Sequence, residues 1–133
     1  MRSPGDVIPE AVPMLKALAC LTLLATPVSA VANDFEPVRD QGEFLKLVQD
    51  RVLRIGLYDL AISLMPDGRI EGSALGWQIT GQWQWQDGYF CREMDWSGTP
   101  IAYNCQLVEV QDGDKMRFTV DRGAGDAAVF RLR

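Results

Sequence analysis

The chain has 133 residues, of which 47% are hydrophobic and 23% are charged, a composition typical of one folded globular domain and not of a disordered chain. It has 13 Lys and Arg residues against 18 Asp and Glu residues, a net charge of −5, and no basic run that could neutralise nucleic-acid phosphates. The acidic excess also argues against electrostatic attachment to an anionic bilayer. The sequence contains no histidine, so the commonest general base and the commonest transition-metal ligand are both missing. We therefore expect a protein that is not an enzyme, with no catalytic residues, no metal, no cofactor and no nucleic-acid partner.

The N-terminal segment predicts a secretory signal peptide. Lys16 precedes an apolar stretch at 17–25, and small residues follow Pro27, which is the order of a basic region, an apolar core and a cleavage site. The apolar core is too short to span a bilayer, which takes roughly 20 apolar residues, and no later segment supplies such a run. We expect no transmembrane segment and a periplasmic or secreted protein.

Two sites match the small-x-small rule for signal-peptide cleavage. Cleavage after Ala32 fits the rule best, and cleavage after Ala30 is the alternative. The true start is expected at Met14 rather than at the first residue, because acidic residues and prolines precede it. Residues 1–32 are therefore interpreted as an N-terminal extension and signal peptide, and residues 33–133 as a single β domain.

Two cysteines, Cys91 and Cys105, would remain after cleavage, in a compartment where thiols are oxidised. A disulfide between them is expected, and closing a loop of about 15 residues would contribute about 3 kcal/mol. The alternative is two buried free thiols. If strands 88–95 and 101–110 pair about Gly98, residues whose numbers sum to 196 face each other, which places Cys91 opposite Cys105.

The rest of the sequence indicates one short helix followed by β-strands. Asp40 and Glu43 match a capping box before an apolar helical face, which predicts a helix over about 41–49. Asp-Gly pairs then separate segments of strand length, as hairpins require: Asp67-Gly68, Asp87-Gly88 and Asp112-Gly113. We predict an all-β fold in which about seven antiparallel strands form a meander closing into a small barrel or a curved sheet. The helix should cover one mouth or edge.

Aromatic residues provide the candidate binding sites. Trp83 and Trp85 alternate with glutamines along one strand, and with Tyr89 they could line a barrel cavity and contact a ligand. The alternative is that these three rings are core. Trp77 and Trp96 lie at predicted turns and are candidate contacts for a partner.

One pair of carboxylates and one acidic turn are further candidate sites. Glu93 and Asp95 share one strand face and could be acid and base of a hydrolase, but a solvated strand end is the better interpretation. Asp112 and Asp114 flank Gly113 without the further oxygen ligands of a calcium loop, so this segment predicts a hairpin turn.

Several motifs between Phe44 and Arg133 carry a resemblance. They are Phe44-Leu45-x-Leu47-Val48-Gln49, Met65-Pro66-Asp67-Gly68-Arg69-Ile70-Glu71-Gly72, Gly81-x-Trp83-x-Trp85, Asp87-Gly88-Tyr89-Phe90-Cys91-Arg92, Asn104-Cys105-Gln106 and Arg117-Phe118-Thr119-x-Asp121-x-Gly123-Ala124-Gly125. In these motifs the chain resembles a family of small secreted proteins of marine and photosynthetic alphaproteobacteria, of the Rhodobacter type. Members are often labelled dihydrodipicolinate reductase, and the resemblance implies no established activity.

The reductase label requires chemistry that this sequence lacks. It implies a Rossmann domain with a glycine-rich turn between a strand and a helix, and a substrate domain that uses histidine and lysine. The segment 123–125 is predicted to lie between two strands, where it is a turn and not a phosphate-binding loop. We therefore expect a periplasmic or secreted β-barrel binding module for a small ligand or a protein partner. The alternative is an accessory or structural envelope protein without a small ligand.

Overall fold

The structure is a computed structural model that describes residues 24–25 and 34–133. The chain divides into residues 1–30 and 31–133, and every helix and strand of the described part belongs to the second unit. Apart from residues 24–25, the expected signal peptide lies outside the described residues, as do both of its expected cleavage sites. No helix in the part that the structure describes is long and apolar enough to cross a membrane.

The described residues form nine β-strands, one α-helix and two short 3₁₀ helices. In chain order they are β1 (Glu36–Val38), α1 (Gln41–Val48), β2 (Leu53–Ile55), η1 (Gly56–Tyr58), β3 (Leu60–Leu64), β4 (Arg69–Ala74), β5 (Trp77–Gln86), β6 (Tyr89–Trp96), β7 (Thr99–Gln111), β8 (Lys115–Thr119), η2 (Asp121–Gly123) and β9 (Ala127–Leu132).

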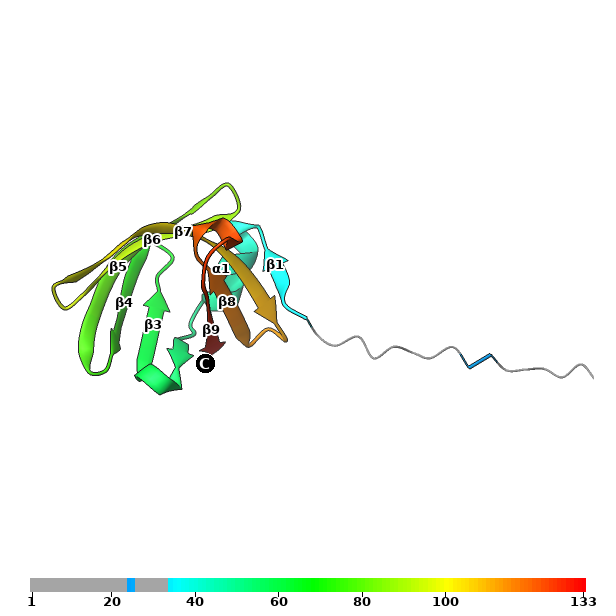
Figure 1. The fold of residues 1–133 in the computed structure, drawn as a ribbon, viewed down its shortest axis with the longest axis horizontal. Helices are drawn as coiled ribbons and strands as arrows, with labels where there is room; N and C mark the ends of the chain where they lie inside the picture. The colour runs from blue at the N-terminus through cyan, green and yellow to red at the C-terminus, as the bar shows by residue number, and fades with distance from the viewer. Residues whose placement is uncertain (1–23, 26–33) are drawn as a thin grey trace, which may run out of the picture. The chain divides into compact units, whose positions relative to one another are not determined.

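Eight of these strands close into an antiparallel barrel. Each strand from β2 to β9 pairs with the next along the chain, and β9 pairs back with β2. Figure 1 shows β3, β4 and β5 on one side and β8 and β9 on the other. β1 lies outside this ring and pairs with residues 108–110 of β7, while β6 pairs with residues 99–106. The predicted all-β barrel with one short helix is confirmed, with eight barrel strands in place of about seven.

The tight hairpins form where the sequence supplies turn residues. Both central residues of a two-residue type I′ turn need a positive φ, which Asp and Gly tolerate. Asp87 and Gly88, which form a two-residue loop, have φ values of 51° and 83°. In the three-residue loop between Gln111 and Lys115, Asp112 and Gly113 have φ values of 54° and 68°. The predicted turns at these pairs are therefore confirmed, and the meander follows from them.

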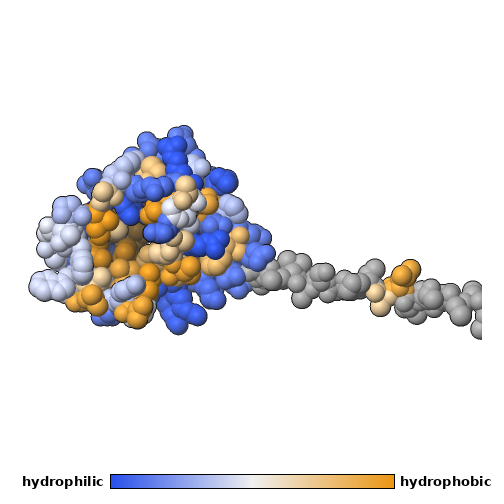
Figure 2. Space-filling view, viewed as in Figure 1, coloured by the Kyte–Doolittle hydropathy of each residue, from blue (hydrophilic) through white to orange (hydrophobic). Residues whose placement is uncertain are grey.

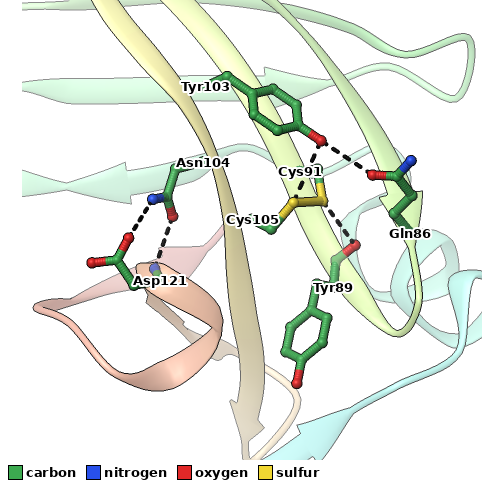
Figure 3. Close-up of a disulfide and its surroundings, with 7 residues drawn as sticks. All are labelled: Gln86, Tyr89, Cys91, Tyr103, Asn104, Cys105 and Asp121. Carbon is green, nitrogen blue, oxygen red and sulfur yellow. Dashed lines mark hydrogen bonds between the residues drawn. A yellow bond between two sulfur atoms is a disulfide. The ribbon is translucent and has the colours of Figure 1, made fainter.

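The disulfide lies across the pairing of β6 with β7. Cys91 is opposite Cys105 and is bonded to it, with 3.9 Å between the Cα atoms. The predicted pairing is confirmed. The register shifts between Arg92 and Met94. Residues whose numbers sum to 196 therefore face each other at the disulfide, as predicted, but not next to the turn between β6 and β7. Figure 3 shows the Tyr103 hydroxyl over the bridge, 3.4 Å from the Sγ atom of Cys105.

Helix α1 closes one end of the barrel. It begins where the Asp40 carboxylate accepts a hydrogen bond of 3.0 Å from the Glu43 N–H, as the capping box predicted. Its Phe44 and Val48 are fully buried. The Phe44 ring packs against four aromatic rings on β5, β6 and β8, with centroids 4.9–6.5 Å away: Trp83, Trp85, Phe90 and Phe118. Since these rings come from different strands around the barrel, the helix seals this end.

Candidate functional site

The barrel contains a cavity of about 270 Å³. The interior of an eight-stranded barrel is just wide enough either to be filled by side chains or to hold one small ligand. Figure 2 shows apolar residues gathered around a hollow on the face in view. The residues that line the cavity are Leu53, Ile62, Leu64, Ile70, Phe90, Arg92, Met94, Gln106, Phe118, Val120, Asp126, Ala127, Ala128 and Phe130.

Small residues at positions beside the cavity explain the space. Ala127 and Ala128 begin β9 in the cavity wall. Gly72 lies on the same face of β4 as the inward-facing Ile70, and Gly81 lies on the same face of β5 as the inward-facing Ile79. Neither glycine contributes a side chain to the interior. A Cβ at Gly72 would collide with the carbonyl oxygen of the adjacent β3 strand. These positions therefore let neighbouring strands approach closely and leave part of the interior unfilled by side chains.

Arg92 brings a charge into the apolar wall. It lies on β6 between Phe90 and Met94, both of which also line the cavity. Its Nη1 atom donates a hydrogen bond of 2.7 Å to the Ala102 carbonyl. Among the described residues no carboxylate lies within 4.0 Å of it. Burial lowers the pKa of the Arg92 guanidinium, because the charged form loses contact with water.

Gln106 places a second polar group on the same wall. It is opposite Phe90, on the strand next to Arg92, so the two side chains are diagonal neighbours on the inner face. Gln106 is only 7% exposed, and within residues 34–133 its side chain makes no hydrogen bond with another residue. Its amide donors and acceptor therefore stay available to a molecule in the cavity. Arg92 and Gln106 together offer converging donors inside an apolar cavity.

The mouth of the cavity is bordered by the loop between β8 and β9. Val120 and Asp126 of this loop line the cavity. Asn104 on β7 holds the loop through two hydrogen bonds with Asp121. The Asn104 Nδ2 donates to the Asp121 carboxylate at 2.7 Å, and the Asp121 N–H donates to the Asn104 Oδ1 at 2.9 Å. Figure 3 shows this pair beside the disulfide. The mouth is thus fixed to β7, and Asp126 adds a carboxylate to it.

The aromatic candidates for ligand contact pack around Phe44 and the β8–β9 loop. Trp83 is buried, packs against Phe44 and donates from Nε1 to the Met65 carbonyl at 3.0 Å. Trp85 is partly buried and also packs against Phe44. Tyr89 is partly buried, with the Arg122 guanidinium 5.4 Å from its ring centroid. None of Trp83, Trp85 and Tyr89 lines the cavity. The two tryptophans belong to the aromatic packing beneath α1, as the core interpretation expected.

The two candidates for partner contact differ in exposure. Trp77 is 63% exposed. Trp96 is partly buried against the core and donates from Nε1 to the Ala74 carbonyl at 3.2 Å. Of the two, only Trp77 presents a large apolar surface to solvent.

The carboxylate pair considered for hydrolysis lies on the outside of the barrel. Glu93 pairs with Gln82, and Asp95 pairs with Thr80, on the solvent face of β5 and β6. The Asp95 carboxylate accepts a hydrogen bond of 2.7 Å from the Gly98 N–H, so it holds the hairpin turn. No metal-binding group of three His, Cys, Asp or Glu side chains occurs within the described residues.

Sequence reasoning missed Arg92 and Gln106 as site residues. A signal for Arg92 was present, because the period of two that places Phe90 and Met94 inward also places Arg92 inward. A charged residue at an inward strand position is unusual enough to mark a site.

Comparisons with known proteins give no relative from which a function could be transferred to this chain. No protein-family model, no curated protein and no solved structure matches the chain.

Proposed function

We propose that this protein is a binding module of the cell envelope that holds a small amphipathic anion in its barrel. The observation that carries this proposal is the apolar cavity with Arg92 in its wall and no carboxylate within 4.0 Å of that guanidinium among the described residues. A partly desolvated guanidinium is costly without a counter-charge. The expected signal peptide and the disulfide support an oxidising location outside the cytoplasm.

The cavity volume limits the apolar part of the ligand. At about 30 Å³ for each non-hydrogen atom, the share of one water molecule in the liquid, a cavity of about 270 Å³ takes roughly nine such atoms. The apolar walls suit an alkyl chain or a small ring, and Arg92 and Gln106 suit a carboxylate or a similar oxyanion. A short fatty acid such as octanoate is therefore a suitable probe.

A ligand series and one pair of variants test this proposal. Octanoate and octanol are titrated by calorimetry into the protein, into Arg92→Met and into the control Lys46→Met, which removes an exposed cation on α1. Octanoate should bind Arg92→Met about tenfold to a hundredfold more weakly, the range for a lost charge-assisted hydrogen bond. Octanol binding should change by less than about threefold, because Met keeps the apolar wall. The Lys46→Met protein should bind both probes as the parent does.

Two results would contradict the proposal. One is failure of both probes to bind the parent protein, which would indicate that the cavity is not a ligand site. The other is equal octanoate affinity in the parent and in Arg92→Met, which would remove the role of the guanidinium. Thermal unfolding of each variant shows that the comparison is made between folded proteins.

An exposed apolar rim supports a second candidate function, contact with an envelope protein. Leu57 is 82% exposed, and Tyr58, Leu75 and Trp77 are each more than half exposed. The Leu75 N–H donates to the Tyr58 carbonyl at 3.0 Å, so the two loops touch. A photo-cross-linking residue at position 77 should capture one protein in the host, and the same residue at exposed Lys46 should not. Identical capture from both positions would argue against this function.

A further inference from the structure

Three cations stand in a row across the outer face of β2, β9 and β8. Arg54 on β2 lies directly opposite Arg131 on β9, and Arg131 lies directly opposite Lys115 on β8. Arg54 and Arg131 are exposed, and Lys115 is partly buried. We call these three residues the cationic row. Like charges directly opposite each other on neighbouring strands destabilise a sheet, so this arrangement needs a physical reason.

The protein has acidic residues in excess, yet no carboxylate of the described residues pairs with the cationic row. Among the described residues the ion pairs join Arg69 to Asp67 and Glu71, and Arg117 to Glu109. The row makes no ion pair within 4.0 Å and no side-chain hydrogen bond inside the part of the chain that the structure describes. The chain carries 18 acidic against 13 basic residues. Within the described residues, the positive charge of this face is therefore left unpaired.

The row also lines a groove that could hold a ligand. The groove has a volume of about 620 Å³, and Phe35, Val129 and Arg133 line it together with the row. The neighbouring Arg117 is already engaged, because its Nε and Nη2 atoms donate to the Glu109 carboxylate at 3.0 and 2.9 Å. Its guanidinium also lies 4.3 Å from the Phe35 ring centroid. Within the described residues, the cationic row thus brings to the groove positive charge and donors that no other side chain engages.

We propose that the cationic row binds a phosphate group. Two guanidinium forks and one ammonium match the several acceptor oxygens and the charge of a phosphate better than the single charge of a carboxylate. The apolar Phe35 and Val129 of the groove would tolerate the organic part of a phosphate ester. Inorganic phosphate and a phospholipid headgroup share this chemistry, and the two sources are separated by experiment. The site is on the outside of the barrel and is independent of the cavity.

The test compares the parent protein, Arg131→Gln and the control Lys46→Gln. Thermal unfolding is measured with rising sodium phosphate and, at matched ionic strength, with sodium chloride. Chloride reports general screening of the like charges, whereas a bound anion adds stabilisation that depends on its affinity. Phosphate should raise the Tm of the parent and of Lys46→Gln more than chloride does. Arg131→Gln should bind phosphate at least about tenfold more weakly, as loss of a charge-assisted hydrogen bond predicts.

A second arm identifies the source of the phosphate. The three proteins are sedimented with phosphatidylcholine vesicles that contain or lack phosphatidylglycerol. Binding to phosphatidylglycerol vesicles that is lost in Arg131→Gln, without an effect of inorganic phosphate, would support the proposal with a lipid headgroup as the source. An effect of inorganic phosphate that Arg131→Gln abolishes would support it with a soluble phosphate. Neither effect in the parent, or equal effects in the parent and in Arg131→Gln, would overturn the proposal.

Discussion

Truncation of Phe44 to alanine tests how α1 is held on the barrel. Phe44 is fully buried and contacts four aromatic rings. An α-helix of eight residues is not stable alone in water, so α1 depends on this side chain and on Val48. Truncation of a buried Phe costs about 3–5 kcal/mol, which is a large part of the roughly 5–15 kcal/mol that stabilises a domain.

Urea unfolding followed by tryptophan fluorescence gives the assay, because Trp83 and Trp85 contact the Phe44 ring. With a slope of about 2 kcal/mol per molar urea for a small protein, a loss of about 4 kcal/mol moves the midpoint down by about 2 M. The control is Lys46→Ala on the exposed face of the same helix, where the midpoint should stay within about 0.3 M. A destabilisation by Phe44→Ala of less than about 1 kcal/mol would refute the conclusion that the helix seals the barrel.

Three further changes have defined outcomes. Replacement of Cys91 and Cys105 together by serine should lower the free energy of unfolding by about 3 kcal/mol, and a loss below about 1 kcal/mol in urea unfolding would contradict that role. Asn104→Ala removes both hydrogen bonds to Asp121 and should speed amide hydrogen exchange in residues 120–126 while costing about 1–2 kcal/mol; unchanged exchange would show that the loop is held otherwise. Asp126→Asn removes the carboxylate at the mouth and should tighten octanoate binding by roughly twofold to fivefold, and weaker binding by calorimetry would count against an anionic ligand.

The hairpins and the disulfide could be predicted because their causes are local. Asp-Gly pairs favour the positive φ values of type I′ turns, and the turn fixes which residues face each other. Once β6 and β7 paired, Cys91 had to lie opposite Cys105. The helix was predictable for the same reason, since Asp40 and Glu43 are three residues apart.

The two short strands β1 and β2 were not predicted. Each has three residues, too few for an alternation of polar and apolar side chains to stand out. β2 is nevertheless the strand that closes the barrel through its pairing with β9. Closure therefore depends on long-range pairing that no local pattern specifies, and this is why the predicted count of strands was too low.

The cavity and the cationic row are products of three-dimensional packing. Alternation predicted correctly that Trp83 and Trp85 face inward, but not that Phe44 would occupy the space beside them. The sequence has no basic run, yet strand pairing brings Arg54, Lys115 and Arg131 together from distant positions. The sequence alone shows neither how much of the barrel interior the side chains fill nor which residues lie opposite each other on paired strands.

The most direct test of the central proposal is an NMR titration of the Arg92 side chain with octanoate. The Nε–H resonance of Arg92 and the side-chain amide of Gln106 should shift and saturate together, because both line the cavity beside the bound head group. The Nε–H resonance of Arg69, which is paired with Asp67 on the outside, should not follow the same binding curve. Octanoate that leaves Arg92 and Gln106 unshifted at concentrations that saturate the protein would contradict the proposal that the barrel cavity holds the anion.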